Sequence, residues 1–88
     1  MKIEYVREDM NAAIAFIKAN NPAMRNKTEL ELIDIVEQLM YSAVANDYYI
    51  NSTAGFHVMR GDENDTFFDI VVSPQFGRNY TRVELEKV

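Results

Sequence analysis

The spacing of the hydrophobic residues divides this chain into segments of two kinds. They alternate with polar residues over residues 1–7, recur every three or four positions from there to about residue 46, and alternate again after it. The alternation predicts short strands, and the spacing of three or four predicts amphipathic helices. No repeat or linker separates the two halves, and 88 residues suffice for one small core. The sequence therefore predicts a single α+β domain spanning residues 1–88.

Two helices are predicted in the first half. Asp9 is expected to cap the first, which ends before Pro22 because proline disfavours helical geometry in the residue that precedes it. The second is expected from about Thr28 to Ala45. It opens with a capping box, in which the Thr28 hydroxyl accepts from the Glu31 amide and the Glu31 carboxylate reaches back.

Alternating segments predict a mixed or antiparallel sheet of four to five strands, against which the two helices pack. The predicted strands are residues 1–7, 47–50, 54–60 and 66–73. The last of these carries Phe68, Ile70 and Val72 on one face and Phe67 and Val71 on the other. Apolar residues on both faces predict a central strand that is covered on both sides.

The charge and the composition narrow the functional classes. Fourteen acidic residues against nine Lys and Arg give a net charge of −5, which disfavours nucleic-acid binding and suits docking onto a basic partner. The absence of cysteine excludes a disulfide framework and a thiolate metal site, and makes the cytoplasm the expected compartment. No uncharged stretch approaches about 18 residues, so no membrane span is predicted.

Few side chains suggest catalysis or metal binding. His57 is the only histidine, and without a nucleophile or an acid paired with it in sequence we interpret it as an ordinary strand residue. The acidic run at residues 62–65 lacks the spacing of a calcium loop, so we expect a polar turn and no metal. No catalytic residue is assigned.

One segment carries a family motif. DIVVSPQFGRNYTRVELEKV, residues 69–88, resembles the central motif of the GNAT superfamily of N-acetyltransferases, in which a strand ending in Val-x-Pro leads through a glycine-containing loop into a helix. The predicted order of elements is similar to the N-terminal half of that fold. The resemblance implies acetyl-CoA as the cofactor, with Val71 and Val72 holding the acyl carbonyl and Gly77, Arg78 and Asn79 holding the pyrophosphate.

The same segment departs from the family in two ways. Asn79 tolerates the left-handed backbone of a glycine position, but the β-branched Thr81 would crowd a phosphate. The chain also lacks the second half of the family's fold, which completes the cofactor cleft. Residues 80–88 alternate as a strand would, although a helix also fits their spacing.

Two functions follow from this resemblance and its departures. One is an N-acetyltransferase that oligomerisation or a partner chain completes. The other, which the sequence favours, is a small acidic interaction module that has kept the fold, lost the cofactor and binds a protein partner. Small acidic domains of this kind occur, by analogy, among virus-encoded proteins that act on the host or sit in the particle.

Self-association is also predicted. Two helices cover one face of a central strand well but leave thin cover on the other, and large exposed apolar patches usually mark interfaces. The surface expected to be buried between copies consists of Phe67, Val71, Phe76, Val83 and Leu85.

Overall fold

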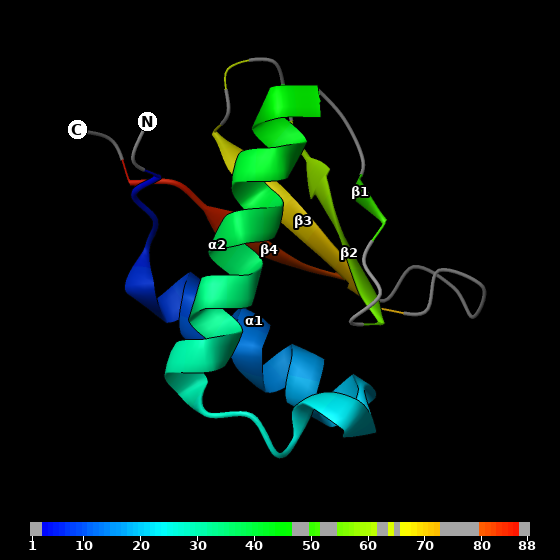
Figure 1. Cartoon of the computed structure of the whole chain (residues 1–88). Helices are drawn as coiled ribbons and strands as arrows, with labels where there is room; N and C mark the ends of the chain where they lie inside the picture. Colours follow the sequence, from blue (N-terminus) through cyan, green and yellow to red (C-terminus); the bar gives the residue numbers. More distant parts are fainter. Residues whose placement is uncertain are drawn as a thin grey trace.

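Two helices lie on one face of an antiparallel sheet (Figure 1). The computed structural model describes residues 3–46, 50–51, 55–61, 64, 66–72 and 80–86. In chain order the elements are α1 (Arg7–Asn20), a 3₁₀ turn (Pro22–Met24), α2 (Glu29–Asn46), β1 (Ile50–Asn51), β2 (Phe56–Arg60), β3 (Phe67–Val72) and β4 (Tyr80–Glu84).

The strands follow one another across the sheet in the order β1-β2-β3-β4, and every neighbouring pair is antiparallel. β3 is an interior strand, as predicted, with Phe68 opposite Arg60 of β2 and Val83 of β4. The α+β class is therefore confirmed. The expected number of four to five strands is slightly too high. Three strands, β2, β3 and β4, have five or six residues, and β1 has only two.

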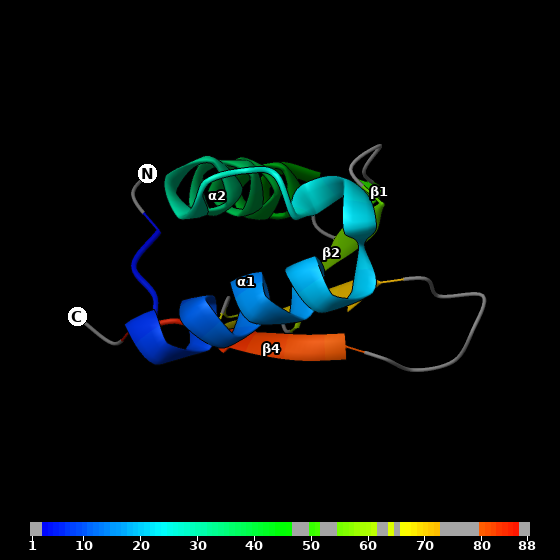
Figure 2. The same cartoon turned by 90° about the horizontal axis from the view of Figure 1, so that it is seen from below.

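Both helices cover the same face of the sheet (Figure 2). α1 packs mainly against β4, and α2 packs mainly against β2. The expectation that β3 is covered on both sides is wrong for the described residues. Phe68 and Ile70 face the helices and are fully buried, whereas Phe67 and Val71 point to the other face, called the open face below, and are partly exposed.

The core lies between the helices and the sheet. Its helical side comes from residues at i, i+3, i+4 and i+7 spacing, which places them on one stripe. The buried residues are Ile3, Met10, Ala13, Ile14, Ile17, Met24, Leu32, Val36, Met40, Ala43, Phe56, Val58, Phe68, Ile70, Val72 and Val83. All of them are apolar, so within the described residues this core has no buried polar side chain to satisfy.

The capping box predicted at the start of α2 is confirmed. The Glu31 amide donates to the Thr28 hydroxyl oxygen at 3.2 Å, and the Thr28 amide donates to the Glu31 carboxylate at 3.4 Å. Two amides that the first helical turn leaves without a backbone partner are thus satisfied.

The start of the chain differs from the prediction. α1 begins at Arg7, after Val6, which provides no side-chain cap. Asp9 therefore lies in the first turn of α1, where its Oδ2 accepts a hydrogen bond from the Glu84 amide at 3.2 Å. The strand predicted over residues 1–7 is reduced to one bridge, which joins Tyr5 to Leu85.

The end of the described chain resolves the two alternatives left by the sequence. Residues Tyr80–Glu84 form β4 and not a helix. Val83 points toward the helices and is fully buried, because it lies opposite Phe68 in the register of β3 and β4. The terminal segment therefore completes the sheet rather than covering its open face.

Candidate functional site

The residues predicted to bind acetyl-CoA are only partly described. Val71 and Val72 lie in β3, while Gly77, Arg78 and Asn79 fall outside the described residues. The resemblance implies a helix after this loop, but residues 80–84 are a strand. The backbone dipole and free amides of a helix N-terminus, which would hold a pyrophosphate, are therefore not provided by these residues.

The strand that was expected to hold the acyl group is paired on both sides. Val71 lies opposite His57 of β2 and Tyr80 of β4. Val71 is the last described residue of β3 that pairs with β4, and its assignment to the acyl carbonyl stays a prediction. His57 itself is partly buried on the open face, as the strand interpretation expected.

The surface predicted for self-association is not one surface. Phe67 and Val71 lie on the open face, Val83 is buried on the opposite face of the sheet, and Leu85 packs against the core beside it. Phe76 lies outside the described residues. The five residues do not form one exposed surface, because Tyr80–Glu84 supply the outer strand of the sheet and Val83 is buried; self-association itself stays a prediction.

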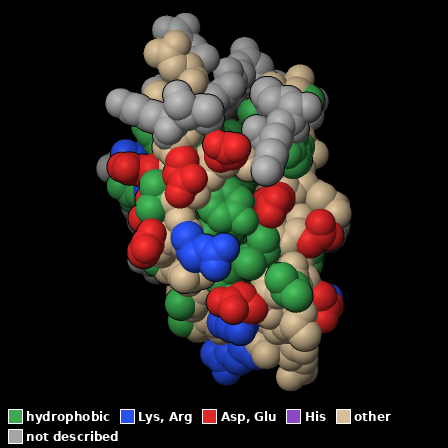
Figure 3. All heavy atoms as spheres, turned by 90° about the vertical axis from the view of Figure 1, so that its left-hand side faces the viewer, with side chains coloured by type: hydrophobic (Ala, Val, Ile, Leu, Met, Phe, Trp, Pro, Cys, Tyr) green, Lys and Arg blue, Asp and Glu red, His purple; other side chains and the backbone are tan. Residues whose placement is uncertain are grey.

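A cleft on another face brings charged groups together. It has a volume of about 400 Å³, and it lies beside the two ends of the described chain. On that face, acidic side chains surround a hydrophobic centre that has a basic side chain next to it (Figure 3). The cleft is lined by Ile3, Glu4, Tyr5, Arg7, Glu37 and Glu86.

Backbone hydrogen bonds hold the walls of this cleft in place. The Glu86 amide donates to the Glu4 carbonyl at 3.1 Å, and the Val6 amide donates to the Glu84 carbonyl at 3.0 Å. The first and last described segments are thus joined on either side of the Tyr5 bridge to Leu85. This pairing places Glu4 and Glu86, which are far apart in sequence, in one site.

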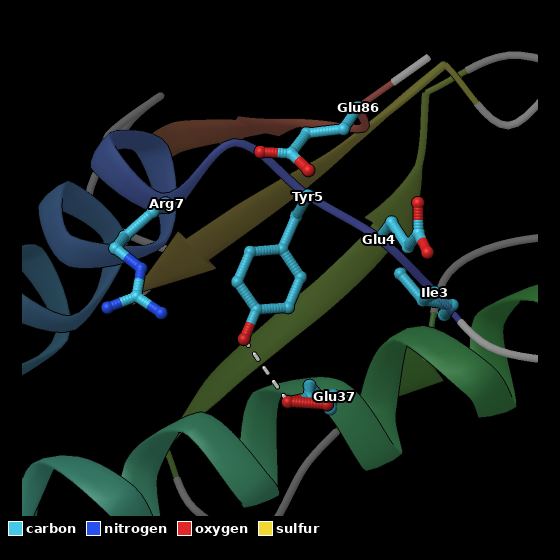
Figure 4. Close-up of a pocket in the computed structure, with 6 residues that line it drawn as sticks. All are labelled: Ile3, Glu4, Tyr5, Arg7, Glu37 and Glu86. Atoms are coloured by element: carbon cyan, nitrogen blue, oxygen red, sulfur yellow. Dashed lines mark hydrogen bonds between the residues drawn. The ribbon is translucent and has the colours of Figure 1, made fainter. Parts of the chain in front are cut away.

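The side chain of Tyr5 spans the cleft. It extends from the N-terminal segment to α2, where its hydroxyl donates to the Glu37 carboxylate at 3.2 Å (Figure 4). Burial, and then the negative charge and the hydrogen bond of Glu37, raise the pKa of the Tyr5 hydroxyl, and Arg7 lowers it slightly. At neutral pH this hydroxyl is therefore protonated and acts as a donor.

The described residues that line the cleft carry three carboxylates and one guanidinium, so their charge balance is negative. The Tyr5 ring and Ile3 add an apolar wall to the cleft. A lysine or arginine side chain matches this combination, because its aliphatic stem packs on apolar surface while its charged end meets carboxylates. In the described part of the chain no three histidine or acidic side chains are arranged to hold a metal ion.

Sequence reasoning missed this cleft. Glu37 falls on the polar side of the helix predicted from Thr28 to Ala45, and Tyr5 falls in the strand predicted over residues 1–7. No local pattern links residues 4, 37 and 86, because the fold alone brings them together. The one available signal was the unequal charge, with acidic residues well in excess of basic ones.

None of the helices in the described part combines the length and the apolar character that crossing a membrane requires. Comparisons with known proteins gave no match, since no family model, no curated protein and no solved structure is significantly similar to this chain. The resemblance to the N-acetyltransferases therefore rests on the sequence motif and the predicted order of elements.

Proposed function

We propose that this protein is a non-enzymatic interaction module that binds a basic segment of a partner protein in the acidic cleft. The observation that carries the proposal is the convergence of Glu4, Glu37 and Glu86 around Tyr5, with Arg7 as the single basic residue among the described residues that line the cleft. The net charge of −5 also favours binding of a basic partner, because it attracts such a partner before the two proteins touch.

The geometry suits binding better than chemistry. Glu37 is engaged by the Tyr5 hydroxyl, which the raised pKa keeps protonated at neutral pH. None of the described residues that line the cleft is a cysteine, serine or histidine. The alternative function, acetyl transfer, needs a helix after residue 79, and no described feature favours it.

A peptide titration tests the proposal. An unstructured peptide rich in lysine and arginine is added to the isotopically labelled protein, and amide shifts are followed by NMR. We expect the largest shifts at Tyr5, Arg7 and Glu37. We also expect the affinity to fall as salt is added, because salt screens the attraction between the solvent-exposed cleft carboxylates and the basic peptide.

A matched pair of double variants separates the cleft from the net charge. Glu4→Gln with Glu86→Gln removes two cleft carboxylates, while Glu8→Gln with Glu29→Gln removes two exposed carboxylates elsewhere. Exposed ion pairs contribute roughly 0.2–1 kcal/mol, so the first variant should lose up to about five-fold in affinity per carboxylate. Equal losses in both variants would show that only the net charge matters, and would defeat the proposal.

A further inference from the structure

The outer edge of β4 is open over part of its length. β4 is the last strand of the sheet, and Figure 2 shows it at the side of the molecule with α1 next to it. At one end of the strand the edge is occupied, because Glu84 donates to Asp9 and accepts from Val6. The open part of the edge lies before Glu84 in the chain, from Tyr80 to Arg82.

The direction of each backbone group in β4 follows from these bonds. The N–H and C=O of Glu84 point away from β3, whereas the Leu85 amide points toward it and donates to Thr66 at 2.9 Å. Backbone groups alternate sides along a strand, so those of Arg82 and Tyr80 also point outward. Among the described residues nothing hydrogen-bonds these outward groups.

We propose that two copies of this chain pair through this edge, antiparallel and about a two-fold axis at Thr81. In this register Tyr80 lies opposite Arg82 of the second copy, and Arg82 lies opposite its Tyr80. Each of these pairs exchanges two N–H···O=C hydrogen bonds, which makes four in total and joins the two sheets.

The other registers are unfavourable. A residue whose backbone groups point outward can pair only with another such residue. The possible positions of the two-fold axis are therefore one residue apart. An axis at Arg82 places two guanidinium groups opposite each other and requires the Glu84 backbone, which already bonds Asp9 and Val6. With an axis at Tyr80, the described residues form two hydrogen bonds instead of four. Thr81 is therefore the centre that the free edge allows.

The side chains at this edge complement themselves. The exposed fractions of Tyr80 and Arg82 are 51% and 43%. Both side chains project to the open face, because Val83, the residue after Arg82, points to the opposite face and is buried under the helices. The Arg82 Nε donates to Asp69 at 2.8 Å, which holds the guanidinium in position. An arginine beside a tyrosine ring on the neighbouring strand gains a cation–π contact.

The helix layer offers a second contact at the same edge. Asp9 reaches the edge at Glu84, and Phe16 lies two helical turns further along the same side of α1. Phe16 is only partly buried and packs against the core. A second copy at the β4 edge would cover the exposed part of Phe16, which adds apolar burial to the four backbone bonds.

Two single-cysteine variants test the register, because the chain has no cysteine of its own. Residues at the axis form a non-hydrogen-bonded pair with Cα atoms about 4.5 Å apart, which is within disulfide range. Thr81→Cys should therefore cross-link rapidly under mild oxidation. In Glu84→Cys, the two thiols would be about 20 Å apart, so we expect little cross-linking. Equal rates for the two variants would overturn the register.

Sedimentation velocity over a range of concentrations tests the pairing itself. Tyr80→Pro removes one outward donor at a strand position that tolerates proline, while Tyr80→Val keeps the donor and removes the ring. The unmodified chain should dimerise at high micromolar concentration, Tyr80→Val more weakly, and Tyr80→Pro not at all, while its circular dichroism stays unchanged. A monomer at every concentration would overturn the proposal. If Tyr80→Pro does not fold, the two cysteine variants decide.

Salt distinguishes this inference from the proposed function. Two copies that each have a charge of −5 repel, so added salt should strengthen the dimer. Binding of a basic peptide in the cleft should instead weaken with salt. The two surfaces share no residue, so either interaction can fail without the other.

Discussion

The guanidinium carbon of Arg82 lies 3.7 Å from the centre of the Phe67 ring. Its Nε and a terminal nitrogen donate to the two Asp69 oxygens, at 2.8 and 3.3 Å. Gly61 leaves room for the same ring, because a methyl group in place of its hydrogen would overlap Phe67. These contacts fix an aromatic side chain on the open face of the sheet, which neither α1 nor α2 covers.

Gly61→Ala should therefore destabilise the fold. The added methyl group must displace the Phe67 ring or shift the backbone where the Gly61 amide donates to the Phe67 carbonyl at 3.1 Å. Overpacking of this kind costs roughly 1–3 kcal/mol. Urea denaturation gives the free energy of unfolding, and the double variant with Phe67→Leu should recover part of the loss. An unchanged stability would contradict the close approach.

The capping box of α2 predicts the effect of Thr28→Ala. The substitution removes the acceptor of the Glu31 amide, which costs about 1 kcal/mol at a helix N-terminus. For a domain of this size that lowers the thermal midpoint by roughly 4–8 °C. Thr28→Ser retains the hydroxyl and serves as the control, so a similar loss in both variants would point away from the hydrogen bond.

Two leucines in the first turn of α2 should respond differently to truncation. Leu32 is fully buried, whereas Leu30 is 79% exposed. Leu32→Ala should lose about 2–5 kcal/mol through lost burial and the cavity that remains. Leu30→Ala should change the free energy of unfolding by less than about 0.5 kcal/mol. Comparable losses would mean that α2 is rotated relative to the sheet.

Tyr5 predicts a dependence of stability on alkaline pH. Its pKa is raised by burial and by Glu37, so the folded state holds this proton more tightly than the unfolded chain does. The stabilisation is present below the ordinary tyrosine pKa of about 10 and is lost as the pH rises through the raised value. The difference in unfolding free energy between the unmodified chain and Tyr5→Phe should shrink over this range. A difference that stays constant over this range would contradict the prediction.

The helices and the interior strand could be predicted because local chemistry determines them. The Thr28 capping box and the stripe from Leu32 to Ala43 specify α2, and the alternation from Phe67 to Val72 specifies β3. The placement of both helices on one face could not be predicted in this way. It depends on Tyr80–Glu84 forming a strand beside β3 and not a helix, and the spacing of these residues left both alternatives open.

The acidic cleft could not be predicted from the sequence for a related reason. Glu4 and Glu86 become neighbours through backbone hydrogen bonds between the two ends of the described chain, and neither residue belongs to a motif. Asp9 shows the same limit on a smaller scale. It has the side chain of a helix cap, yet it lies inside the first turn and bonds the distant Glu84 amide.

The packing of α1 against β4 sets the order in which the molecule can fold. Met10, Ile14 and Ile17 lie near the start of the chain, and the strand they cover begins only at Tyr80. A contact this distant in sequence requires closure of a loop almost as long as the chain, which slows folding compared with a helical bundle. We expect α2 to dock on the β2–β3 hairpin first, with α1 and β4 closing last as one step.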